Sequence, residues 1–270
     1  MVFDRAGRRS GSRGGRILSL YDVPTMSRRS RIRVGLQASL CLALLPGVTS
    51  LCRADGHWSG SVAATTDYVF RGISQTYGGA ALQAGLDYQS STGWFAGSWA
   101  SNVSPYPFDS DAAEINVYTG FGRTLSPAWT ARASYTRYLY TWDRRRKPYD
   151  YGEFAVTLQF RDRLSATISY QPDNTRFATS GYVRNRQSLA YELTGRWALP
   201  QRFALAGGVG YYDLSHLYGV SYWAGDAGVS YTYGRFEVDL TRFVADKTVR
   251  RLFEDASADG RWVASAVFRF

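Results

Sequence analysis

Apolar and polar residues alternate along most of the chain after residue 55. The last ten residues show the pattern without a break, and their apolar row is Trp262, Ala264, Ala266, Phe268 and Phe270. A period of two predicts an extended strand whose two faces meet different environments. We therefore expect a β-strand that closes a transmembrane barrel, because closure leaves no unpaired sheet edge.

Eleven more segments of roughly ten residues repeat this alternation, which is about the length that crosses a bilayer when a strand is tilted. Their apolar rows run from Val62 to Phe70, Leu82 to Tyr88, Phe95 to Val103, Ile115 to Phe121, Trp129 to Tyr135, Phe154 to Phe160, Leu164 to Tyr170, Leu189 to Trp197, Phe203 to Tyr211, Trp223 to Tyr231 and Phe236 to Leu240. The predicted fold is all-β, an antiparallel up-and-down barrel of about twelve strands.

The links between these segments alternate between short and long. The long ones are expected at residues 72–79, 104–112, 141–150, 172–187, 213–221 and 244–260. Outer-membrane barrels have short periplasmic turns and longer external loops, so both chain ends are predicted on the periplasmic side.

Alternation alone does not show which face of the barrel contacts water, because a soluble calyx would bury its apolar rows inside. The opposite faces carry charges that a small soluble barrel could bury only at several kcal/mol each. Aromatics also gather at strand ends, including Tyr68, Phe70, Trp94 and Trp129, as in interfacial girdles. Twelve strands moreover make a ring too wide for side chains alone to fill. We therefore expect apolar rows toward lipid and a polar lumen.

The inward parity gives a list of expected pore-lining residues, in which acids outnumber bases. They are Asp67, Arg71, Asp87, Glu114, Arg132, Glu153, Glu192, Arg196, Asp226, Glu237, Asp239 and Arg269. Wall carboxylates raise the local cation concentration, so mild cation selectivity is predicted. Three arginines fall instead on the lipid-facing parity near strand ends, Arg123, Arg137 and Arg242, where they either reach headgroup phosphates or mark a local slip of register.

Residues 1–54 lack the alternation and have the features of a targeting segment. Residues 26–54 hold a basic stretch, an apolar stretch and a small-residue site before Asp55, which predicts a secretory signal, and residues 1–25 look like upstream sequence. A lipoprotein reading of Cys52 is disfavoured by the bulky Leu51 before it. Residues 1–54 contribute +8 of the net charge of +10, so basicity is no evidence for nucleic acid. The barrel domain is expected at residues 55–270, without cysteine.

Candidate chemistry is sparse. The expected barrel contains two histidines, His57 and His216. Asp213, Ser215 and His216 are neighbours in one loop, but closeness in sequence does not bring their side chains into a catalytic arrangement. No catalytic residue, cofactor or metal site is therefore expected. Two other features have open interpretations. A row of small inward residues at 204–210 indicates a wide lumen or a packed inserted loop, and the basic run at 144–147 is a solvated loop or a contact with lipopolysaccharide phosphates.

A longer motif carries a family resemblance. Residues 64–75 read ATTDYVFRGISQ, followed by LQAGLDY at 82–88 and GSWASNV at 97–103. Together with Glu114, Tyr118 and Gly120, they resemble the TorF-type family of porin-like proteobacterial outer-membrane proteins. The resemblance implies a barrel in the outer membrane and a porin function. Phe268 and Phe270 likewise resemble the signal by which outer-membrane barrels are recognised for assembly.

The expected function is a channel in the cell outer membrane for passive diffusion of small hydrophilic solutes or ions, and not an enzyme. The expected partners are outer-membrane lipid, lipopolysaccharide and the barrel assembly machinery, with no nucleic acid. A closed structural or surface-interaction barrel is the alternative from another class, and a barrel hydrolase comes third.

Overall fold

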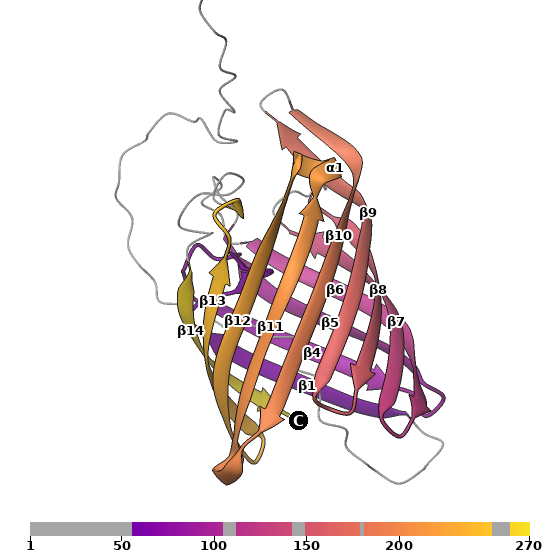
Figure 1. Cartoon of the computed structure of the whole chain (residues 1–270), viewed down its shortest axis with the longest axis vertical. Helices are drawn as coiled ribbons and strands as arrows, with labels where there is room; N and C mark the ends of the chain where they lie inside the picture. Colours follow the sequence, from indigo (N-terminus) through magenta and orange to yellow (C-terminus); the bar gives the residue numbers. More distant parts are fainter. Residues whose placement is uncertain (1–55, 105–111, 142–148, 179–180, 250–259) are drawn as a thin grey trace, which may run out of the picture.

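The computed structural model describes residues 56–104, 112–141, 149–178, 181–249 and 260–270 (Figure 1). The predicted signal at 26–54, both cysteines and the basic run at 144–147 lie outside the described residues. Within those residues no helix is long and apolar enough to cross a membrane.

Twelve antiparallel strands form one closed barrel, as the alternation predicts. Their bounds are β1 His57–Thr65, β4 Ala81–Gln89, β5 Trp94–Val103, β6 Ala112–Ser126, β7 Trp129–Tyr140, β8 Tyr151–Phe160, β9 Leu164–Ala178, β10 Gly181–Ala198, β11 Phe203–Leu214, β12 Val220–Tyr233, β13 Phe236–Ala245 and β14 Arg261–Arg269. Each strand pairs with its neighbours in the chain, and β1 also pairs with β14, so no edge is left open.

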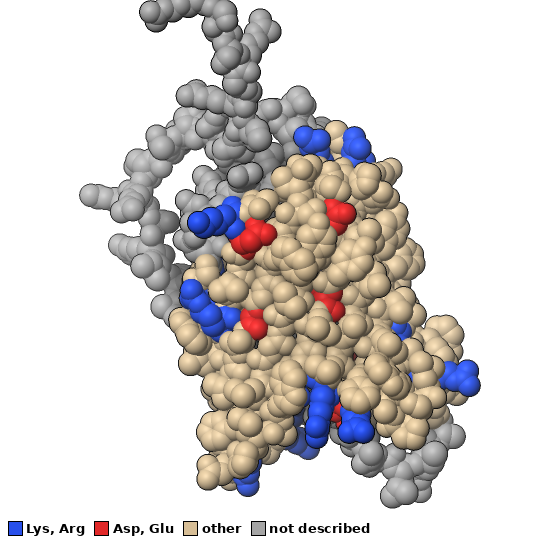
Figure 2. All heavy atoms as spheres, in the orientation of Figure 1, with Lys and Arg blue, Asp and Glu red and all other residues tan. Residues whose placement is uncertain are grey.

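The outer surface is apolar. Large apolar side chains such as Leu82, Val156 and Leu193 are about half exposed on the chain itself, with Val156 reaching 60%. Charged side chains are few on the face that Figure 2 shows. Two of the three outward arginines near strand ends have partners, because Arg137 pairs with Asp173 at 2.5 Å and Arg242 lies over the ring of Trp262.

The two ends of the barrel differ. Short links at 90–93, 127–128, 161–163, 199–202 and 234–235 lie at the end that holds the C-terminus (Figure 1), and the backbones of Gly60 and Phe270 bond to each other there. The 199–202 link contains the 3-10 helix η1, Pro200–Arg202, and the opposite, long-loop end contains the one-turn helix α1, Ser215–Tyr218.

Two details of the predicted strand pattern after residue 81 are wrong. Residues 172–187 are not a loop, because β9 continues to Ala178 and β10 begins at Gly181. This hairpin projects beyond its neighbours in Figure 1, with bulges around Arg186. The parity of β5 is also inverted. Trp99 and Val103 are 6% and 5% exposed and face inward, since they pack against residues inside the barrel, whereas Trp94 faces outward at 59%.

Candidate functional site in the barrel interior

The interior is crossed by residues 66–80, which we call the inserted segment. It includes two short strands, β2 Val69–Phe70 and β3 Ile73–Ser74, which pair only with each other. Thr65 of β1 and Ala81 of β4 are direct partners in the barrel, so the segment is an excursion from a closed hairpin. The sequence prediction that this stretch continues a membrane strand through Tyr68 and Phe70 is wrong, because Tyr68 is 4% exposed and buried inside the barrel.

The inserted segment is folded on itself around one carboxylate. Asp67 accepts hydrogen bonds from the hydroxyls of Ser74 and Thr76 at 2.6 and 2.8 Å. The backbone N–H of Tyr68 donates to Thr76 Oγ1, and the N–H of Gln75 donates to the carbonyl of Tyr68. These bonds join the outgoing arm of the segment to its returning arm, so it forms a compact unit of its own.

The tip of the unit is a two-residue turn at Arg71 and Gly72. Both residues have positive φ, 51° and 80°, as a type I′ hairpin turn requires. Glycine suits this conformation, but arginine is disfavoured there because its Cβ crowds the backbone. A Cβ at Gly72 would lie 2.5 Å from the Cβ of Ala224, so the turn sits directly against β12.

One side of the inserted segment contacts strands β5 to β7. Tyr68 packs edge-on against Trp99 with ring centroids 5.4 Å apart. Its hydroxyl donates to the carboxylate of Glu114, which is buried and also accepts from Asn116. Phe70 packs against Tyr138 at 6.2 Å. The inward aromatic side of β5 thus has a partner, which explains the inverted parity.

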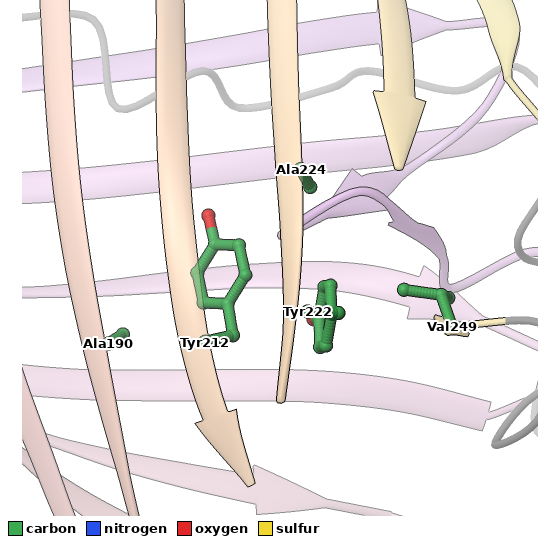
Figure 3. Close-up of a cluster of buried hydrophobic side chains, with 5 residues drawn as sticks. All are labelled: Ala190, Tyr212, Tyr222, Ala224 and Val249. Atoms are coloured by element: carbon green, nitrogen blue, oxygen red, sulfur yellow. The ribbon is translucent and has the colours of Figure 1, made fainter. Parts of the chain in front are cut away.

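Arg71 connects the tip of the inserted segment to strands β8, β10 and β11. Its guanidinium lies 2.9 Å from Glu153 on β8 and 3.5 Å from Glu192 on β10, and it stacks on Tyr212 at 5.5 Å. The hydroxyl of Tyr222 donates to the Arg71 carbonyl. Figure 3 shows Tyr212 and Tyr222 on neighbouring strands beside Ala190, Ala224 and Val249, and Ile73 of the segment packs against this cluster.

The remaining side contacts β13 and β14. Val69 packs with Phe243 and Val263, both buried. Arg261 pairs with Asp67 at 2.6 Å. Arg261 has the inward parity of Val263 but was absent from the predicted lining, and extending the alternation of β14 by one residue would have found it. The inserted segment therefore touches every wall from β5 to β14 except β9 through the contacts described.

Asp67 and Arg71 are thus residues of the inserted segment and not of the barrel wall. The other ten predicted lining residues lie on barrel strands, and several are paired. In the short-turn half, Glu237 bridges Arg196 at 3.0 Å and Arg269 at 3.3 Å, and Tyr118 donates to Asp87 at 2.5 Å. Arg132 lies over the ring of Phe95. The side chains of Arg196 and Arg269 stay 26% and 32% exposed, so this half of the interior admits water.

The row of small residues on β11 is covered at its long-loop end. The ring of Tyr212 lies across Gly210, where a Cβ would meet the Tyr212 hydroxyl at 2.2 Å. The same ring contacts Arg71. Further down, Gly208 lies beside the carboxylate of Asp226. The upper end of this row is therefore covered by Tyr212 of the same strand, and the inserted segment reaches it only through the contact of Arg71 with that ring.

The loop residues considered for hydrolysis form a local turn. The carboxylate of Asp213 accepts from the backbone N–H of Ser215 and from the hydroxyl of Ser221, each at 2.9 Å. These bonds hold the entry to α1. Among the residues the structure describes, no group of three or more His, Cys, Asp or Glu side chains could hold a metal ion.

Fold and interior together define a porin-type barrel: twelve antiparallel strands, an apolar outer face, and charged residues inside. The chain belongs to the family described as "Bacterial protein of unknown function (Gcw_chp)", whose model matches residues 53–257. That match includes the whole inserted segment.

One solved porin shares this fold at low sequence identity, and a second is reported beside it. The structure titled "NanC porin structure in rhombohedral crystal form" is 11% identical with a TM-score of 0.53, covering 78% of this chain and 98% of that one. A "KdgM porin" structure is 7% identical with a TM-score of 0.47, covering 80% and 99%. No curated protein matches the chain in sequence.

Proposed function

We propose that this protein is a porin-like channel of the bacterial outer membrane through which small hydrophilic solutes or ions diffuse. The observation that carries the proposal is the charged, partly solvent-exposed interior of the short-turn half, where Arg196, Glu237 and Arg269 line a barrel that is apolar outside. Diffusion needs a wet passage and no reactive group. The resemblance of residues 64–75 to TorF-type proteins agrees with this function.

The partners and the location follow from the same proposal. The apolar exterior fits outer-membrane lipid, and the basic residues at strand ends fit headgroup or lipopolysaccharide phosphates. Residues 26–54 would direct secretion, and Phe268 and Phe270 would present the last strand to the barrel assembly machinery.

A closed structural barrel is the second candidate, and the inserted segment is the observation that favours it. Conductance of the refolded protein in a planar bilayer separates the two. A channel gives discrete current steps in potassium chloride. Silence of both the natural protein and a variant that lacks the inserted segment would reject the channel and leave the closed barrel.

A further inference from the structure

We infer that the inserted segment is a displaceable plug of this channel and that Arg71 is the latch that holds it in place. The inference rests on the proposed channel function and adds its regulation. Its starting point is that residues 66–80 reach from the hinge between β1 and β4 to the opposite wall, at the level where Glu153 and Glu192 face inward.

The segment is built to move as one piece. Its two arms are joined by the bonds around Asp67 and by the β2–β3 pairing, which do not involve the barrel wall. Two backbone–backbone hydrogen bonds join it to the rest of the barrel, from Thr66 to the carbonyl of Ala264 and from Ser104 to the carbonyl of Gln75. At the tip, the Tyr222 hydroxyl donates to the Arg71 carbonyl. Between these points, side chains make most of the described contacts with the wall.

Arg71 makes two ion pairs with the barrel wall at the tip. It is a buried cation between two carboxylates from strands that are not neighbours, so it ties the tip to β8 and β10 at once. Its backbone occupies the left-handed region, φ 51°, where asparagine or glycine would fit a type I′ turn better. A disfavoured backbone conformation persists where surrounding contacts stabilise it. Here these contacts are the ion pairs of the Arg71 guanidinium with Glu153 and Glu192.

The carboxylates at the latch have other partners besides Arg71. Glu153 accepts from Gln171, and Glu192 accepts from the hydroxyl of Tyr212 at 3.0 Å. Losing Arg71 therefore leaves each carboxylate a hydrogen-bond donor from the wall. The barrel keeps its strands and its polar network, whereas the segment loses the ion pairs that hold its tip.

The first test removes the plug. Because Thr65 and Ala81 are direct partners, residues 66–80 can be replaced by Asn-Gly, a two-residue hairpin turn. We expect the single-channel conductance of this variant to exceed that of the natural protein severalfold in the same salt. Equal conductances would overturn the plug and leave the channel function intact. Silence of both the excised variant and the natural protein would overturn the channel function, and this inference with it. A silent excised variant beside a conducting natural protein would overturn the plug alone.

The second test releases the latch and keeps the turn. Asn suits the type I′ geometry, but its side chain is too short to reach Glu153 and Glu192. We therefore expect single channels of the Arg71→Asn variant to spend a severalfold larger fraction of the recording at the high conductance of the excised variant. Arg132→Asn is the matched control, because Arg132 lies in the lumen over Phe95 and away from the segment. A double variant, Glu153→Gln with Glu192→Gln, should reproduce the effect, and adding Arg71→Asn should change little more. Equal behaviour of the Arg71 and Arg132 variants would reject the latch.

Discussion

At the residue scale, neighbouring side chains on one strand meet different surroundings. Val156 and Thr157 on β8 are adjacent, yet Val156 is 60% exposed on the apolar outside, whereas the hydroxyl of Thr157 bonds across to Thr167 at 2.9 Å inside. This difference follows from the pleat of the strand, which sends successive Cβ atoms to opposite faces.

The pair gives a direct test of orientation in lipid. Val156→Arg should lower the free energy of unfolding by about 2 to 4 kcal/mol, the cost of an arginine facing the middle of the bilayer on a barrel. Thr157→Arg, one residue away, should cost clearly less because the lumen solvates the charge. Urea-induced unfolding in lipid vesicles measures both. Equal losses would show that the exterior of β8 does not face hydrocarbon.

At the element scale, the last strand closes the barrel. β14 pairs with β13 and β1, and Phe268 and Phe270 lie at its short-turn end with ring centroids 6.0 Å apart. Phe270 is 57% exposed, as its proposed role in assembly requires.

Phe270→Ser should therefore reduce the amount of inserted barrel in the outer membrane while leaving the conductance of each inserted molecule unchanged. Phe236→Ser is the matched control. Phe236 faces outward at the same end of the barrel and is 60% exposed, but it is the first residue of β13 and not part of the last strand. Immunoblots of outer-membrane fractions measure the yield. Normal accumulation of the Phe270 variant would remove the role of β14 as an assembly signal.

The β9–β10 hairpin and the short links lie at opposite ends of the barrel, so labelling them tests the predicted orientation in the membrane. The two cysteines of the chain, Cys41 and Cys52, lie in the predicted signal, and replacing both by serine lets each introduced cysteine report alone. Arg186→Cys on the projecting hairpin should react on intact cells with a thiol reagent that cannot cross the outer membrane. Asp162→Cys in a short link should react only after the cells are broken. The reverse pattern would place the short links outside.

At the scale of the whole molecule, ion pairs reduce the field that the lining residues create. Arg71, Arg196, Arg261 and Arg269 each lie within 3.5 Å of a carboxylate. Rings of unpaired carboxylates would favour cations more strongly than this partly neutralised wall does. The acidic excess that remains includes Asp226 and Asp239, both half-buried on β12 and β13.

We expect mild cation selectivity that weakens as salt rises, because screening shortens the reach of the wall charges. In the variant with Asp226→Asn and Asp239→Asn, the reversal potential in a potassium chloride gradient should move toward zero. Asp162→Asn, outside the lumen, should leave it unchanged. Anion selectivity of the natural protein would contradict an acidic lining.

The sequence by itself determined the barrel, its number of strands and most of its parity. These are local properties, because a period of two needs only one strand and two environments. It also placed ten charged residues on interior-facing wall positions. It could not distinguish residues 172–187 from a loop, since Pro172, Asn174 and Asn185 are typical of turns and only pairing with a neighbouring strand extends the hairpin.

Only the tertiary structure decided that residues 66–80 cross the interior. Tyr68 and Phe70 continue the apolar row of the preceding strand in the sequence, and the Arg71–Gly72 turn is the one local signal against this prediction. The groups that hold the segment, such as Trp99, Glu153, Glu192 and Arg261, are scattered over the next two hundred residues of the chain. They meet only because the barrel closes, so the burial of Tyr68 and the inward turn of Trp99 are consequences of closure that no local pattern contains.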